Sequence, residues 1–250
     1  MARRTLTIFL VIAVIIGIGC VRLGFWQLDR LAQRRAANAL VAGRIDAPPV
    51  SLDQLPADTS QSRYRRVILH GTFDYEHELV LGGRTRNGSP GINFLTPFRM
   101  PGRDTAVLIN RGWVYAPDAM TVDLARWREP DQPELEGIVN SFHDPGTGVA
   151  EMADHPGVYR RLDQAALAAA LPYPLADYYV MAVSPPIGPI DSVPVRLPPP
   201  PLDEGPHLSY ALQWFSFALI SFGGAGAVWW GRREDREQRI VPPAPELPRA

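Results

Sequence analysis

The stretch HLSYALQWFSFALISFGGAGAVWW, residues His207–Trp230, decides the fold, because no charged side chain follows its first histidine. As a helix, its residues from Leu208 to Trp230 rise about 34 Å, enough to cross the hydrocarbon layer of a bilayer with some tilt. Trp229 and Trp230 suit the interfacial aromatic belt, and a basic group follows on the cytoplasmic side: Arg232, Arg233, Arg236 and Arg239. We predict a transmembrane helix at 207–230 and a cytoplasmic tail at 231–250.

His207 lies at the outer membrane surface in this interpretation. At helical spacing it shares one face with Ala211, Trp214 and Ala218. A histidine and an indole separated by small residues could form a shallow groove for a flat apolar ring system. The same face could equally be a seam for packing another helix, and the histidine could simply hydrogen-bond to lipid headgroups. The spacing alone leaves these interpretations open.

A second apolar run lies near the start of the chain. Residues 1–4 form a short basic lead, and we predict a first transmembrane helix at 5–26, in which Arg22 snorkels and Trp26 anchors the far interface. No small-residue cleavage site follows, so the run is interpreted as an anchor and not as a signal peptide. Cys20 is expected inside this helix, with a lipid anchor as the minor alternative. Two spans place both termini in the cytoplasm of a cell-membrane protein.

The part between the spans is divided into three regions. Residues 27–63 are predicted to be a juxtamembrane helix, Asp29–Gly43, and a linker; residues 64–183 an extracytoplasmic β-rich domain; and residues 184–206 a proline-rich return linker. The fold class is therefore a membrane-anchored α+β protein, with two transmembrane helices flanking one mainly antiparallel β domain with helical insertions.

The strands of that domain are predicted from runs of β-branched and aromatic residues. Tyr64–Asp74 and His77–Arg86 are expected to form one antiparallel hairpin, with a loop at 87–91 after it. Ile92–Phe98 and Thr105–Val114 are expected to form another. Further elements are predicted as strands at 134–140 and 178–183 and a helix at 162–171.

The charge and cysteine content exclude several classes of function. Acidic side chains outnumber basic ones by five between Gly24 and Pro206, which offers no electrostatic footprint for nucleic acid. The single cysteine of the chain falls in the first span, so the outer domain is expected to fold without disulfides or a thiolate metal site.

No enzyme motif is found in the sequence. It has no G-x-S-x-G elbow, no H-E-x-x-H, no phosphate loop and no C-x-x-C, and we predict that the protein is not an enzyme. One acidic and histidine-rich group is interpreted as solvated side chains on a hairpin tip, because alternate strand residues point to opposite faces: His70, Asp74, Glu76, His77 and Glu78. His143 and His155 have no ligand-spaced partner. Arg84 and Arg111 are interpreted as surface or half-buried arginines paired with carboxylates.

Five strings together resemble the Surfeit-locus-one (Surf-one, Shy-one) family of cytochrome c oxidase assembly factors, in their order, spacing and membrane placement. They are GFWQLDR at Gly24–Arg30, YRRVILHGTFD at Tyr64–Asp74, the arginine of LGGRTR at Leu81–Arg86, VLINRGWV at Val107–Val114 and HLSYALQWF at His207–Phe215. The resemblance runs from Gly24 to about Trp230.

The resemblance implies an assembly factor that binds haem A and helps to place it in the oxidase catalytic subunit. In that case His207 is the ligand of the haem iron, Tyr210 and Trp214 wall the ring, and Trp26 and Arg30 complete the site from the first helix. The implied partners are the catalytic subunit, the haem-A synthase and the lipid bilayer. The sequence departs from the family at Asp203–Pro206, where other members frequently have asparagines.

The alternative hypothesis is a cofactor-free scaffold that stabilises an oxidase assembly intermediate through its β domain. In it the remaining motif residues maintain the fold: Gly71, Arg84, Arg111, Gly112 and Trp113. A membrane-anchored hydrolase is a remote third hypothesis, because no nucleophile and base are found.

Overall fold

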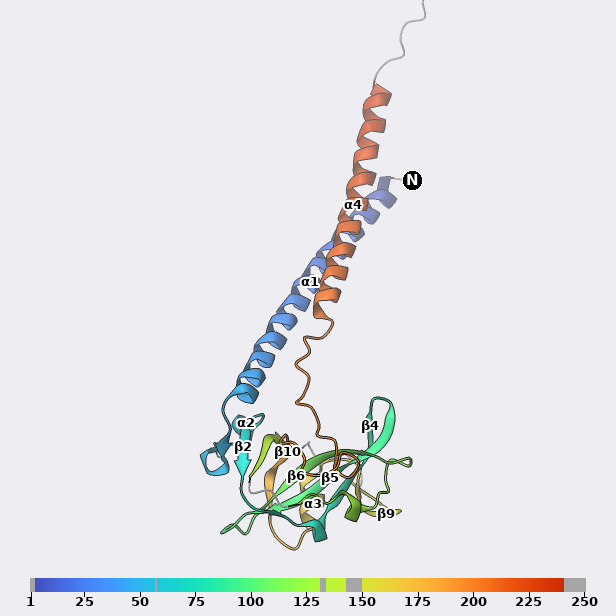
Figure 1. The fold of residues 1–250 in the computed structure, drawn as a ribbon. Coiled ribbons are helices and arrows are strands. Elements are labelled where there is room, and N and C mark those ends of the chain that lie inside the picture. Colours follow the sequence, from blue (N-terminus) through green and yellow to red (C-terminus); the bar gives the residue numbers. More distant parts are fainter. Residues whose placement is uncertain (1–2, 57, 131–133, 143–149, 241–250) are drawn as a thin grey trace, which may run out of the picture. The chain divides into compact units, whose positions relative to one another are not determined.

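The computed structural model describes residues 3–56, 58–130, 134–142 and 150–240 (Figure 1). The chain forms two compact units. The helical unit consists of the chain up to Ala39 and from Asp203 onward, and the sheet unit runs from Leu40 to Leu202.

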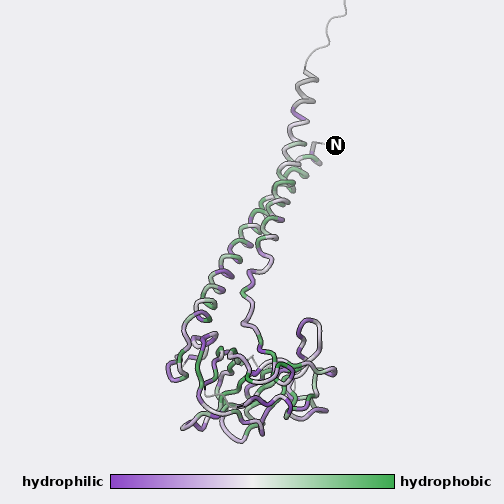
Figure 2. The backbone as a smooth tube through the Cα atoms, in the orientation of Figure 1, coloured by the Kyte–Doolittle hydropathy of each residue, from purple (hydrophilic) through white to green (hydrophobic). Residues whose placement is uncertain are grey.

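The helical unit contains most of α1, Arg3–Asp46, and all of α4, His207–Ile240. Each has a stretch long and apolar enough to cross a membrane, within Arg4–Asp46 and His207–Arg233. Figure 2 shows the apolar residues (green) concentrated where the two helices run together. The two helices are therefore compatible with a two-pass membrane protein.

The first helix does not end where a separate juxtamembrane helix was predicted to begin. It continues unbroken from the apolar run through Asp46, because no proline interrupts residues 27–46 and the residues there favour a helix. Pro48 and Pro49 follow its end, as expected, since a residue before proline is disfavoured in helical geometry.

The sheet unit is built on a single sheet, which within the described residues has ten strands in the order β1-β2-β7-β10-β6-β5-β4-β9-β8, with β3 paired to β5. The strands are β1 Val50–Ser51, β2 Arg66–Leu69, β3 Thr72–Phe73, β4 Leu79–Arg86, β5 Ser89–Arg99, β6 Ala106–Tyr115, β7 Leu135–Ser141, β8 Glu151–Met152, β9 His155–Tyr159 and β10 Leu175–Ala182. The short helices are η1 Leu52–Gln54, α2 Thr59–Ser62, η2 Tyr75–His77, η3 Leu124–Trp127 and α3 Gln164–Ala169.

The sheet is mixed, although antiparallel pairs predominate among its described strands. Three pairs are parallel: β1 with β2, β10 with β6, and β4 with β9. The last strand, β10, lies between β6 and β7, parallel to the first and antiparallel to the second. The prediction of a mainly antiparallel domain is therefore confirmed, while the three parallel pairs were not predicted.

One predicted hairpin is confirmed and one is wrong. β5 and β6 pair antiparallel, as predicted. The segment Tyr64–Asp74 does not pair with β4; its strand β2 pairs with β1 and β7, and η2 follows where the turn was expected. The antiparallel neighbour of β4 is β5, which is joined to it through Asn87 and Gly88, whose φ angles are 50° and 79°. An Asn-Gly pair suits such a two-residue turn, because both positions need positive φ.

Both faces of the central strands are buried, so core clusters lie on both sides of the sheet. Leu108 and Tyr179 point into one cluster, which α3 helps to cover, while Ile109 and Val180 point into the other. Because both faces are covered, β6 and β10 have nearly continuous apolar sequences instead of alternating ones. The predicted strands at 134–140 and 178–183 and the helix at 162–171 are confirmed as β7, β10 and α3, with shifted ends.

Candidate functional site

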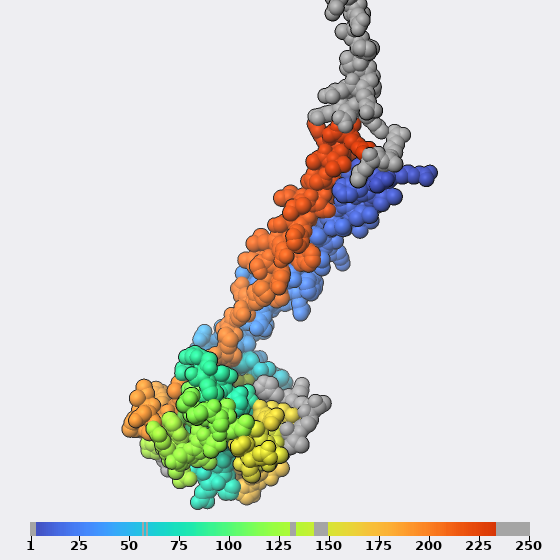
Figure 3. Space-filling model, turned by 90° about the vertical axis from the view of Figure 1, so that its right-hand side faces the viewer, coloured from blue at the N-terminus to red at the C-terminus, as the bar shows by residue number. Residues whose placement is uncertain are grey.

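The two helices of the helical unit pack along a narrow seam (Figure 3). On α1 the buried residues alternate between spacings of four and three: Ala13, Gly17, Cys20, Gly24, Gln27 and Leu31. On α4 the buried residues recur at seven: Ala211, Ala218 and Ala225. This heptad pattern of small residues is typical of closely packed helices in membranes. The small face beside His207 is therefore a helix-packing seam, and Ala211 and Ala218 are not free to floor an open groove.

Close approach along the seam depends on glycine. A Cβ added at Gly24 would lie 2.6 Å from a ring carbon of Phe215. The same phenylalanine contacts Phe25 edge to face, with ring centroids 5.4 Å apart. Ser221 donates a hydrogen bond to the carbonyl of Ala13 at 2.7 Å. These contacts set α1 and α4 antiparallel, with the last part of the α1 seam beside the start of α4.

At that start, His207 meets α1. Its ring nitrogen Nδ1 donates a hydrogen bond to Oε1 of Gln27, with the two atoms 2.9 Å apart. Gln27 is buried, while His207 is only partly covered. Sequence reasoning missed Gln27, although its place in the four-three series with Gly24 and Leu31 marks it as facing the other helix.

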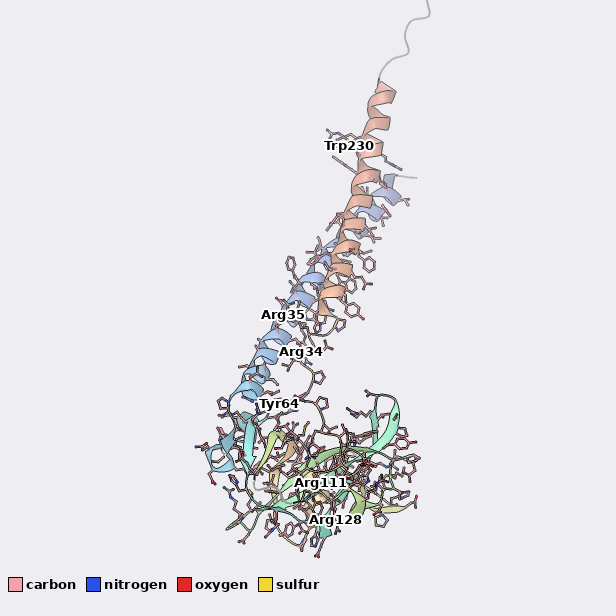
Figure 4. The ribbon with its side chains drawn as sticks, viewed as in Figure 1. Arg34, Arg35, Tyr64, Arg111, Arg128 and Trp230 are labelled. Atoms are coloured by element: carbon pink, nitrogen blue, oxygen red, sulfur yellow. The ribbon has the colours of Figure 1, made fainter. Side chains whose placement is uncertain are left out.

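The residues just before α4 bind to arginines of α1, which Figure 4 labels. Arg35 forms two hydrogen bonds to the Glu204 carboxylate, at 2.8 and 2.9 Å, and this hydrogen bonding lowers the pKa of Glu204. Arg34 donates to the backbone carbonyl of Asp203 at 2.9 Å, and the Asp203 carboxylate accepts from the Gly205 N–H. Asp203 and Glu204, which stand where asparagines are frequent in the family, thus bind the segment before His207 to α1.

The other residues predicted to form the site are spread around the helices. Trp26 and Tyr210 are about half exposed, at 52% and 47%. Trp214 is partly covered and contacts Phe217 edge to face. Trp26 lines a shallow groove of about 650 Å³ on α1, whose lining does not include His207. Arg30 donates to Gln33 on its own helix at 3.0 Å.

One motif residue of the sheet unit, Arg111, which Figure 4 labels, belongs to a buried charge network. The Arg111 side chain is fully buried and contacts Glu78 at 2.6 Å and Glu129 at 3.1 Å. Arg196 contacts the other oxygen of Glu129, also at 2.6 Å. Arg111 was predicted to pair with a carboxylate, which is confirmed, but it is not at the surface. The positive charges of the two arginines balance the negative charges of the two glutamates. These partners are too far apart in the sequence for the pairing to be predicted from it.

Glu78 also corrects the interpretation of the acidic and histidine-rich group. Its side chain is 1% exposed, so it is not a solvated residue on a hairpin tip. Asp74 accepts hydrogen bonds from Tyr173 at 2.7 Å and His77 at 2.8 Å. Desolvation raises the pKa of Asp74, but these hydrogen bonds outweigh it and the pKa lies below its ordinary value. In the described part of the chain, no group of three or more potential ligands is arranged to hold a metal ion.

Close backbone contacts in the sheet unit involve three of the motif residues: Gly71, Gly112 and Trp113. A Cβ at Gly71 would lie 2.2 Å from the carbonyl oxygen of Arg99. Gly112 has φ +130°, and a Cβ there would lie 2.3 Å from the carbonyl oxygen of Val195. Trp113 and Val195 exchange two backbone hydrogen bonds, at 2.8 and 2.9 Å. The proline-rich segment is therefore fastened to the sheet through Val195 and Arg196.

Arg84 differs from Arg111. In the described residues it forms no ion pair and donates to the backbone carbonyl of Arg160. Burial lowers the pKa of its guanidinium. The predicted pairing of Arg84 with a carboxylate is therefore not found there. His143 lies outside the described residues.

Comparisons with known proteins agree with these features. The model of the SURF1 family matches residues 14–219, which include all five motif strings. A SURF1-like protein of Monosiga brevicollis is 27% identical over 223 residues, covering 83% of this chain and 80% of that protein. A SURF1-like protein of Drosophila melanogaster is 28% identical over 237 residues, covering 86% and 73%.

A yeast protein adds a shorter but more similar match. The cytochrome oxidase assembly protein SHY1 of Saccharomyces cerevisiae is 34% identical over 103 residues, covering 39% of this chain and 26% of that protein. The family match covers well over half of the chain and both of its compact units. The chain therefore belongs to the SURF1 family.

Proposed function

We propose that this protein is a membrane-bound assembly factor for cytochrome oxidase, which carries haem A on His207 and assists its insertion into the catalytic subunit. Family membership and the name of the yeast relative support the assembly function. In this proposal the protein binds its cargo and does not catalyse a reaction.

The observation that carries the haem proposal is the position of His207. It is the first residue of α4, it is partly exposed, and its Nδ1 is engaged by Gln27. The second ring nitrogen, Nε2, is then the one available to an iron. Neutral imidazole is a common axial ligand of haem iron. The His207 imidazole is therefore a suitable ligand for the iron of haem A.

The surroundings of His207 fit the other parts of haem A, which has a flat ring, two carboxylates and a long isoprenoid tail. Arg30 follows Gln27 by about one turn of α1, and a guanidinium group suits a carboxylate, whereas Arg34 and Arg35 already bind Asp203 and Glu204. On the other side of His207, α4 offers Tyr210 and Trp214 among apolar residues. The ring would be bound at the helix surface, because the seam itself is closed by α1.

We place the protein in the cell membrane, with the sheet unit outside and both termini in the cytoplasm. Arg232 and Arg233 directly follow the apolar part of α4, and such basic residues remain on the cytoplasmic side. The sheet unit is then on the side where it can contact the oxidase catalytic subunit and the haem-A synthase.

The test is an absorption spectrum with pyridine haemochrome analysis of the protein purified in detergent from cells that make haem A. Wild type should contain about one haem A per chain, His207→Ala should lose it, and His70→Ala, which changes an exposed histidine of the sheet unit, should retain it. A well-folded wild-type protein that promotes oxidase assembly yet takes up no haem would contradict the haem proposal. The cofactor-free scaffold would then be the function.

A further inference from the structure

We infer that Gln27 is a positioning residue that fixes which nitrogen of His207 carries the proton. Its side-chain carbonyl accepts the Nδ1–H bond, so Nε2 presents a lone pair at the surface of the helical unit. The use of that lone pair for iron rests on the function proposed above. The proton position itself does not, because it is a property of the unloaded protein.

The geometry of the pair makes this assignment specific. Nδ1 and Oε1 are 2.9 Å apart, a normal hydrogen-bond length, and Gln27 is 9% exposed. An amide buried between apolar helices needs a partner, because an unsatisfied polar group there is costly. His207 supplies that partner from the other helix, across 180 positions of sequence.

The seam holds the two side chains in register. Gly24, one turn before Gln27, lets Phe215 approach, and Ala211, one turn after His207, is 1% exposed. Packing on both helices therefore fixes the backbones from which the two side chains project. A site whose donor lies on α4 thus depends on α1 for the orientation of its ring.

The chemical consequence follows from the tautomers of histidine. In water the neutral side chain prefers the proton on Nε2, which is the wrong arrangement for a ligand at that atom. An acceptor at Nδ1 reverses this preference, and it also makes the imidazole a more basic ligand. Loss of such an outer partner typically weakens metal binding about 10- to 100-fold. Gln27 should thus raise haem affinity and lower the reduction potential of the bound iron.

The first experiment uses the unloaded full-length protein in lipid nanodiscs with ¹⁵N-labelled histidine, with the His207 signals assigned through His207→Ala. Wild type should show a protonated Nδ1 and an unprotonated Nε2. Gln27→Leu should move the proton toward Nε2, and Gln27→Glu should restore it to Nδ1. The matched control is Gln33→Leu, which removes a glutamine on the same helix whose amide oxygen accepts only from Arg30 in the described residues. It should leave the spectrum unchanged.

The second experiment measures haem A affinity and the midpoint potential of the same variants. Gln27→Leu should lose about 10- to 100-fold in affinity and shift the potential upward, while Gln27→Glu should shift it downward. A His207 ring protonated on Nε2 in wild type would overturn the inference, because the amide would then be donating. So would a Gln27→Leu spectrum identical to wild type. Absence of haem from wild type with the expected tautomer would refute only the proposed cargo.

Discussion

Substituting Gly112 tests whether the proline-rich segment is an integral part of the sheet unit. In Gly112→Ala, the new Cβ would lie 2.3 Å from the carbonyl oxygen and 2.8 Å from the carbonyl carbon of Val195. Both atoms belong to the backbone, so the segment must move away. The φ of +130° is also a conformation that residues other than glycine adopt only with strain.

The magnitude follows from these two effects. Backbone strain of this kind costs about 1–3 kcal/mol. Displacing Val195 breaks its two hydrogen bonds to Trp113, each with a net value of about 0.5–1.5 kcal/mol. Together they predict a loss of about 4 kcal/mol in the free energy that holds the segment on the sheet. Since about 1.4 kcal/mol corresponds to a factor of ten, opening should become nearly a thousandfold more frequent.

Hydrogen exchange of the full-length protein in detergent, followed by mass spectrometry, measures this opening at the Val195 amide. The matched control is Gly102→Ala, because Gly102 has φ +73° but nothing within 4 Å of an added Cβ. Only the strain of the left-handed conformation, about 1–2 kcal/mol, should appear there, and away from Val195. Equal protection of Val195 in Gly112→Ala and wild type would refute the reasoning.

Two further predictions concern the sheet unit. Arg111→Met leaves Glu78 and Glu129 buried beside a single remaining arginine, so the free energy of unfolding in urea should fall by about 3–5 kcal/mol. Asp74→Asn removes a carboxylate whose folded pKa is lowered, so the stability that Asp74 contributes is fully present above its ordinary value of about 4. The difference in stability between wild type and Asp74→Asn should therefore shrink as the pH falls below about 4, measured by urea unfolding from pH 7 to pH 2.

Controls for these two predictions come from exposed residues of the same unit. Arg126→Met removes an exposed arginine and should change stability by less than about 0.5 kcal/mol. Asp104→Asn makes the same change at an exposed aspartate of this unit and is the matched control for Asp74→Asn. A stability loss in Arg111→Met no larger than that in Arg126→Met would contradict the buried network. A pH-independent difference for Asp74→Asn would contradict the hydrogen-bonded carboxylate.

Features that depend on local sequence were predictable. The two apolar helices follow from uninterrupted hydropathy, and the β5 and β6 hairpin from two apolar runs joined by a short turn segment. The error over Tyr64–Asp74 has a physical cause, because β2 finds its partner in β7, far along the chain, instead of in the next strand. Alternation and turn residues carry no information about such distant pairing.

The candidate site was predictable only in part for the same reason. His207 is marked by its position at the start of an apolar helix, but its partner Gln27 is 180 positions away. The interpretation of Arg111 as an ion-paired residue was correct, yet its burial depends on Glu78 and Glu129, which are 33 and 18 positions distant. Whether a charged side chain is buried depends on strands from different parts of the sequence, so the local sequence does not reveal it.

The place of β10 in the sheet has a consequence for the timing of biosynthesis. Among the strands in the described residues, β10 is the last to leave the ribosome, yet it is hydrogen-bonded on both sides, to β6 and to β7. Until Ala182 has been made, both of those strands present unpaired edges, which are prone to wrong pairing. The meander of β4, β5 and β6 and the pair of β8 and β9 can form earlier, since their contacts are close in sequence. The sheet can therefore be completed only after Ala182 has been synthesised. This is close to the time at which His207, the first residue of α4, is added to the nascent chain.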